Sequence, residues 1–181
     1  MGIDKALYLA EMRTLLRKAR QRWMKRFPEI EIYSINVWTY PATCTSAINL
    51  DTREHSKTTV AHAKRFARHQ RAYAIREGNK ELARLFDRWK KIDRETNPTE
   101  FAFPQFVTTG NQSFDAKWAK SARCWPALGP LLQNVRDMAA EAFAETKLHR
   151  DAEVSVNGEN NWCEGRRRIK AGKTKRKPSR S

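Results

Sequence analysis

Three histidines recur at intervals of seven residues, and they are the first residues whose spacing suggests chemistry. They are His55, His62 and His69. Imidazole is a common metal ligand. On a helix, however, seven residues advance roughly 10 Å, which is too far for two imidazoles to share one ion. We therefore predict no metal and no cofactor, and we interpret His62 and His69 as titratable members of a basic helix face.

The cysteines offer a second possible chemistry. Cys44, Cys124 and Cys163 are few, widely spaced and without a Cys-x-x-Cys pair. Such a set is typical of reduced thiols rather than of a disulfide framework. A nucleophilic cysteine would need a base close in space, and the alternative is a buried structural thiol. We favour the structural interpretation for each of the three.

Recognised catalytic motifs are missing. The chain contains no glycine-rich phosphate loop, no His-Glu-x-x-His and no Gly-x-Ser-x-Gly. Carboxylates such as Glu54, Asp93 and Glu100 could form a hydrolytic pair, but no spacing singles them out. The sequence favours a protein that is not an enzyme. The alternative is an enzyme whose site is assembled only by the fold.

Charge is the strongest compositional signal. The chain has 36 Lys and Arg against 20 Asp and Glu, a net charge of +16. Nine of the cations and no acid fall in residues 165–181, which leaves +7 for residues 1–164. A surplus of this size indicates a polyanionic partner, such as a nucleic acid or an acidic protein.

The sequence gives no indication of a membrane partner. No stretch approaches the roughly 20 apolar residues that span a bilayer. The start of the chain carries Asp4 and Glu11 and does not resemble a secretory signal. We expect a cytoplasmic protein. The run KTKRKPSR could instead serve nuclear import in a eukaryotic host.

The stretch from Glu29 to Thr52 predicts two paired strands. Ile30 and Ile32 share one parity and Ile35 and Val37 the other, which is typical of a central strand with two buried faces. Pro41 interrupts the pattern. Residues 44–50 then alternate small or apolar with polar side chains, so we expect an antiparallel partner.

Long amphipathic helices flank this pair. Apolar residues at spacings of three and four predict helices over 3–27, 56–77, 80–95 and 130–149, the last one starting at Pro130. The stripe of the third helix is Leu82, Leu85, Phe86, Trp89 and Ile92, and we expect it to pack in the core.

Together these elements predict an α+β fold. A small antiparallel sheet, with strands near 30–38, 44–50, 101–107 and 153–157, would pack against three or four long helices. The strand near 101–107 should lie at an edge because it contains Pro104. After Asn157-Gly158, Trp162 and Cys163 could lie on a short return strand. Residues 1–164 would form one domain and residues 165–181 a disordered basic tail.

The first two helices and the tail carry the cations that we expect to bind a polyanion. No acid interrupts residues 56–76, and a helix this basic usually presents a binding face. The expected contact residues are Arg13, Arg17 and Arg20 in the first helix, Lys57, Lys64, Arg65, Arg68 and Arg71 in the second, and Arg166, Arg167, Arg168, Lys175, Arg176 and Lys177 in the tail.

Two tryptophans lie among further cations. Trp118 and Trp125 stand near Lys117 and Lys120, and aromatics mixed with basic side chains can stack on bases. The alternative, which we favour, is that they cover the core, because large aromatics are mostly buried.

The order of elements also resembles a known group of domains. The strand IEIYSINVW, the strand SAINLDT and the helix from Pro130 followed by VSVNGE are similar to certain bacterial domains of unknown function found near toxin systems. The resemblance implies an immunity-type role. Because this chain is basic, an immunity or counter-defence factor of this kind would dock an acidic partner. The basic second helix and tail depart from that group.

Our first hypothesis is a non-enzymatic protein that binds RNA or DNA through the phosphate backbone. Such contacts give affinity without reading sequence. No helix-turn-helix, zinc-finger or RNP signature indicates base-specific readout. The alternative is the immunity-type factor. Both hypotheses leave the oligomeric state open.

Overall fold

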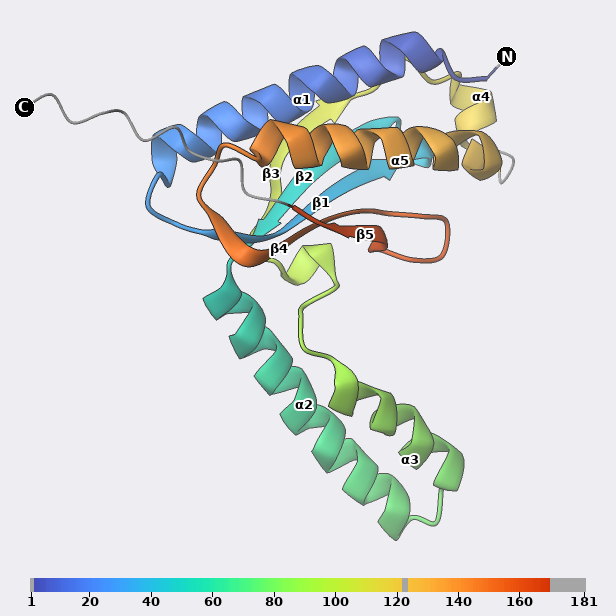
Figure 1. Cartoon of the computed structure of the whole chain (residues 1–181). Coiled ribbons are helices and arrows are strands. Elements are labelled where there is room, and N and C mark those ends of the chain that lie inside the picture. Colours follow the sequence, from blue (N-terminus) through green and yellow to red (C-terminus); the bar gives the residue numbers. More distant parts are fainter. Residues whose placement is uncertain (1, 122–123, 170–181) are drawn as a thin grey trace, which may run out of the picture.

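The computed structural model describes residues 2–121 and 124–169, and it has an α+β fold (Figure 1). Five strands form one sheet in the order β3-β2-β1-β4-β5. The strands are β1 (Ile32–Tyr40), β2 (Thr45–Asp51), β3 (Phe103–Gly110), β4 (Leu148–Val156) and β5 (Glu164–Arg168). The helices are α1 (Lys5–Arg26), α2 (Arg53–Arg76), α3 (Lys80–Asp87), α4 (Ala116–Ala119) and α5 (Cys124–Phe143), with 3₁₀ turns at η1 (Pro41–Thr43), η2 (Arg88–Lys91) and η3 (Pro98–Glu100).

The sheet is mixed rather than antiparallel. β1 lies at its centre and pairs antiparallel with β2, as predicted, but it pairs parallel with β4. The chain crosses over through α5 before β4, so β4 enters in the same direction as β1. The alternation of side chains along a strand does not show whether the neighbouring strand runs parallel or antiparallel to it. The edge position predicted for the strand containing Pro104 is confirmed, because β3 pairs only with β2.

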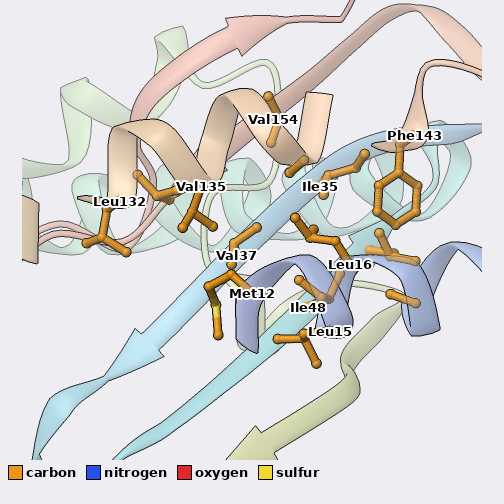
Figure 2. Close-up of a cluster of buried hydrophobic side chains, with 14 of the residues drawn as sticks. Met12, Leu15, Leu16, Ile35, Val37, Ile48, Leu132, Val135, Phe143 and Val154 are labelled. Atoms are coloured by element: carbon orange, nitrogen blue, oxygen red, sulfur yellow. The ribbon is translucent and has the colours of Figure 1, made fainter. Parts of the chain in front are cut away.

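One face of the sheet is covered by α1 and α5 (Figure 1). Figure 2 shows the residues of this core: Met12, Leu15 and Leu16 of α1 and Leu132, Val135 and Phe143 of α5 converge on Ile35, Val37, Ile48 and Val154 of the sheet. All ten side chains are buried. The apolar stripe predicted for the first helix is therefore confirmed as a core face.

The last helix begins earlier than predicted. α5 starts at Cys124 and ends at Phe143, and Pro130 lies inside it. Proline lacks an N–H, so at Pro130 it removes one hydrogen bond of the second turn, to the carbonyl near the helix start. Pro126 occupies the first turn, where the N–H has no partner inside the helix in any case. The predicted range, 130–149, therefore began and ended six residues too late, which is about a turn and a half.

α2 and α3 form a hairpin that projects from the sheet, on the side opposite α1 and α5 (Figure 1). Thr52 caps α2 by accepting a hydrogen bond from the His55 N–H at 3.3 Å. The contact between the two helices is narrow. The buried residues of α2 are Ser56, Val60, Ala67 and Ala74, and α3 buries only Ala83.

The predicted core stripe of the third helix is only partly covered. The helix ends at Asp87 and continues as η2. Leu85 is 53% exposed and Trp89 39%, while Leu82, Phe86 and Ile92 are half-buried. The expectation of core packing was wrong here, because α3 packs against α2 and not against the sheet.

After the hairpin the chain returns to the second face of the sheet, and Arg94 fixes it there. The Arg94 guanidinium stacks over the Tyr33 ring at 3.7 Å. It donates hydrogen bonds to the carbonyl oxygens of Tyr33 at 2.8 Å and Asp151 at 2.6 Å, and Glu153 lies 3.5 Å from it. Only 7% of Arg94 is exposed. The Tyr33 ring, the two carbonyl oxygens and Glu153 together replace the water that the guanidinium loses on burial.

The predicted tail begins too early. Gly165 to Arg168 belong to β5, which pairs antiparallel with β4, and Ile169 is buried. This is the return strand, and it starts just after the predicted Trp162 and Cys163. The remaining part of the predicted tail, 170–181, lies outside the described residues.

Trp23 belongs to a cluster of four aromatic rings, and its truncation tests the α1 packing. Its ring lies within 5.8 Å of the rings of Phe27, Phe103 and Phe106. We predict that Trp23→Ala lowers the free energy of unfolding by about 3–5 kcal/mol, measured by urea denaturation. Met24→Ala, one residue away and 46% exposed, should change it by less than about 0.5 kcal/mol. Equal midpoints for the two variants would contradict this packing.

Candidate nucleic-acid interface

The projecting hairpin carries most of the net charge of the folded chain. Residues 53–93 contain twelve Lys and Arg and five Asp and Glu, a net charge of +7. Residues 94–169, in contrast, contain ten of each and are neutral overall. α1 has the same net charge of +7, from eight Lys and Arg and one Glu. The hairpin is therefore one of two electropositive elements, and it is the one that stands clear of the sheet (Figure 1).

Four of the predicted contact residues form one stripe along α2. Lys57, Lys64, Arg68 and Arg71 follow each other at spacings of seven, four and three, so they share one side of the helix. That side borders α3 and η2. A groove of about 310 Å³ opens there, lined by Lys64, Ala67, Arg68, Arg71, Phe86, Trp89 and Lys90.

The groove combines cations with flat apolar surface. Phe86 and Trp89 line it from α3 and η2, and the small Ala67 lines it from α2. Trp89 remains 39% exposed. Phosphate groups bind cations of this kind, and an aromatic face can stack on a base or cover a sugar. The sequence indicated Lys64, Arg68 and Arg71 as contact residues but not Lys90 of η2. The two aromatics were missed because their whole stripe was predicted to lie in the core.

Asp87 partly neutralises the groove. Its Oδ1 accepts hydrogen bonds from Arg71 Nε at 2.9 Å and lies 2.7 Å from Lys90 Nζ. The bond from Lys90 and the charge of Arg71 hold the pKa of Asp87 below its ordinary value, so it is ionised at neutral pH. Four cations and one carboxylate leave a net local charge of +3.

Arg65 lies on the other side of α2. It is exposed, as are His62 and His69. Nearby, the Arg76 guanidinium lies 5.3 Å from the centre of the Tyr73 ring. The basic surface of α2 thus continues around the helix, but it is not part of the groove.

The cations of α1 lie apart from the hairpin. Arg13 and Arg17 are exposed, and Arg20 pairs with Glu145. α1 covers the opposite side of the sheet (Figure 1). The predicted contact residues of the first two helices therefore do not form one continuous surface.

The arginines predicted in the tail are strand residues. Arg167 donates to Asp137 Oδ1 at 2.8 Å, Arg168 lies 3.3 Å from Asp151, and Arg166 is exposed. Two of the three thus have carboxylate partners within the fold. Lys175, Arg176 and Lys177 lie outside the described residues.

Trp118 and Trp125 both pack against the hydrophobic core. The Trp118 ring lies 6.1 Å from that of Phe114. The interpretation that these tryptophans cover the core is confirmed.

Asp51 and His55 form a hydrogen-bonded pair of titratable side chains. Asp51 is fully buried, and its Oδ1 accepts from a His55 ring nitrogen at 2.9 Å and from the N–H groups of Thr52 and Ala102. Burial raises the pKa of Asp51 above its ordinary value in spite of these bonds. The pair ties the start of α2 to β2 and to the chain before β3. The bonds of Oδ1 have this structural role, whereas the buried Oδ2 has no hydrogen-bond partner in the described part of the chain.

The other candidate groups stay apart. Glu54, Asp93 and Glu100 are all exposed. Within residues 2–121 and 124–169, no three His, Cys, Asp or Glu side chains gather in a way that could hold a metal ion.

The thiols are positioned as structural groups. Cys124 and Cys163 are buried, and burial raises the pKa of both thiols. Cys163 Sγ donates to the carbonyl oxygen of Thr96 at 3.1 Å. Cys44 is half-buried.

Comparisons with protein-family models, with curated proteins and with solved structures found no match for this chain. The resemblance to immunity-type domains therefore stays a prediction. No helix in the described part of the chain has both the length and the apolar composition to cross a bilayer.

The thiol environments predict a simple labelling pattern. In the native protein at pH 8, Cys44 should react with a thiol reagent much faster than Cys124 and Cys163, whose thiols are buried and whose raised pKa values keep them protonated. All three should react rapidly in denaturant. A Cys44→Ser variant that still labels rapidly when native would show that a second thiol is activated.

Proposed function

We propose that this protein binds nucleic acid through the α2–α3 hairpin, by contacts to the phosphate backbone that do not read sequence. The observation that carries the proposal is the groove between α2 and η2. Lys64, Arg68, Arg71 and Lys90 surround Phe86 and Trp89 on an element of net charge +7.

Phosphate binding explains features that folding alone does not require. An isolated folded hairpin would be more stable with alternating charges, because like charges three and four residues apart repel. Lys64, Arg68 and Arg71 stand at these spacings, and Asp87 is the acid that meets the groove. A polyanion removes the repulsion and releases its own counterions. The proposal includes no catalytic step.

An acidic protein is the second candidate partner. Phe66 and Tyr73 are 59% and 50% exposed on the side of α2 away from the groove, and apolar side chains beside cations also suit a protein interface. This candidate retains the immunity-type role as a proposal. Binding of an acidic protein without any affinity for nucleic acid would favour it.

Neutralising two groove cations tests the proposal. We predict that the double variant Lys64→Gln, Arg68→Gln weakens binding to RNA and DNA by roughly tenfold or more at low salt. It should also flatten the plot of log affinity against log salt by about 0.9 per lost phosphate contact on a duplex. Fluorescence anisotropy across a salt series measures both quantities.

The matched control is Arg13→Gln, Arg17→Gln. It removes the same charge from exposed positions of α1, on the other side of the sheet. We expect the hairpin variant to lose more affinity for nucleic acid than the α1 variant does. If the α1 variant loses as much affinity, net charge alone accounts for binding and the groove has no special role.

Removing the groove's carboxylate should have the opposite effect and increase the affinity for nucleic acid. Asp87→Asn frees Arg71 and Lys90 from their carboxylate, so we expect tighter binding and a steeper salt dependence. Asp93→Asn makes the same change of net charge at an exposed residue outside the groove and should have a smaller effect. Equal effects of the two variants would argue against a role for the groove.

A further inference from the structure

The second face of the sheet contains a larger groove, of about 650 Å³. It lies on the side to which the hairpin projects. Arg94, which follows the hairpin, bonds the Ser34 hydroxyl, and Ser34 has the same parity in β1 as Trp38 and Tyr40, which line the groove. The volume falls within the range typical of ligand sites.

The shape of the groove follows from the strand register. Ala47 of β2 lies opposite Trp38 of β1 and Thr108 of β3. The small alanine between two larger side chains leaves a depression. Trp162, from the connection before β5, packs against Trp38 at 5.2 Å between ring centres and forms the outer wall. Tyr40 follows Trp38 on the same face, roughly 6.6 Å further along the strand.

A chain of buried amides lies beside the groove, on the same face of the sheet, and connects its walls. Asn49 Oδ1 accepts from the Gln105 N–H at 2.8 Å, and Asn49 Nδ2 donates to Asn36 Oδ1 at 3.1 Å. Asn36 Nδ2 in turn donates to the carbonyl oxygen of Trp162 at 2.9 Å. Asn36 and Asn49 are 0% and 1% exposed. The network therefore links one wall, at Gln105, to the other, at Trp162.

The backbone is also strained at this place. Gln105 has φ of +46°, in the left-handed region that non-glycine residues rarely adopt. It lies where the pairing of β2 with β3 shifts register, between Ile48 and Leu50. Strained residues and bulges that are held by surrounding bonds tend to occur at binding sites. A sheet edge selected only for stability would not need this conformation.

The lining selects an uncharged, flat ligand. The groove's described lining contains aromatic rings, hydroxyls and one amide but no charged side chain. Stacking surface with polar groups around its edge suits a planar base, whose rim carries hydrogen-bond donors and acceptors. A phosphate would find no cation there. The cations stand instead on the hairpin, which projects from the same side of the sheet.

We propose that this groove, between Trp38, Tyr40 and Trp162, stacks unpaired bases of a single-stranded nucleic acid. The inference rests on the proposed function and makes it narrower: the preferred ligand is a single strand and not a duplex, because the bases of a duplex are already paired and stacked. Phosphates would bind the hairpin cations and bases the sheet face.

The test uses the full chain and labelled oligonucleotides, a single strand and a duplex of equal length. Tyr40→Ala and Trp162→Ala remove rings that are 49% and 48% exposed, so the core is left intact. We expect each variant to lose roughly tenfold in affinity for the single strand. Duplex affinity and salt dependence should stay unchanged, since no cation is removed. Tyr40→Phe should bind as the unaltered chain does, because it keeps the ring.

Tyr73→Ala is the control for loss of an exposed ring. Tyr73 is 50% exposed but lies on the hairpin, and its loss should spare the preference for the single strand. Melting temperatures establish that each variant is folded.

The inference is overturned if Tyr40→Ala and Trp162→Ala bind the single strand as tightly as the unaltered chain. It is also overturned if they lose single strand and duplex equally.

The two proposals can fail separately. Binding that depends on Lys64 and Arg68 but not on Tyr40 and Trp162 removes only the inference about bases. Single-strand binding that depends on the two aromatics but not on the cations removes the hairpin as the phosphate site. If the unaltered chain binds neither ligand, both proposals are wrong.

Discussion

The structure depends on one constraint: the cations that surround α2 cannot be buried without partners. Moving an unpaired charge from water into a protein interior is costly. α2 therefore buries only a narrow strip of small residues, Val60, Ala67 and Ala74 among them. That strip is wide enough to hold α3 but not to form a second layer on the sheet. The hairpin consequently projects into solvent.

The same constraint leaves the second sheet face incompletely covered. α1 and α5 complete the core on the first face. On the second, the segment after the hairpin covers the end near α2, where Arg94 and Phe101 are buried. The other end, around Trp38 and Tyr40, stays open. The cost of burying the α2 cations thus explains both the projecting basic hairpin and the uncharged aromatic groove that it leaves open.

Hydrogen bonds between buried amides hold the side chains next to the open end of this face. Asn36 and Asn49 occupy central strands where apolar side chains would be expected, and each amide finds its partners within the sheet and its neighbours. A buried polar network is costly if any member lacks a partner, and when complete it specifies one arrangement. These hydrogen bonds therefore connect the two walls of the groove, at Gln105 and Trp162, through the sheet.

Local patterns predicted the parts of the fold that local forces decide. Alternation in residues 44–50, the stripe through Met12 and Trp23, and the proline of β3 correctly indicated a strand, a core helix and a sheet edge. The parallel pairing of β1 with β4 depends on a crossover, which no local period encodes. The start of α5 was missed because proline was taken as a boundary.

The candidate site was predicted only in part. The cations of α2 could be recognised from composition. Trp89 was not, because the helical period identifies a stripe but not whether a partner exists to cover it. Trp38 and Tyr40 share a parity in β1 with Ser34 and Asn36, but these two polar residues are buried, so parity alone does not show which end of this face stays open. Trp162, more than a hundred residues later, joins them only through the fold.

The most direct measurement is the salt dependence of single-strand binding for the full chain and for a variant that ends at Ile169. The shorter chain loses six cations but keeps β5, the hairpin and both grooves. We predict that both chains bind at low salt. For the shorter chain, the slope of log affinity against log salt should be about −2 or steeper, as several phosphate contacts to the hairpin require. If the shorter chain does not bind, the residues after Ile169 supply the affinity and the hairpin is not the nucleic-acid interface.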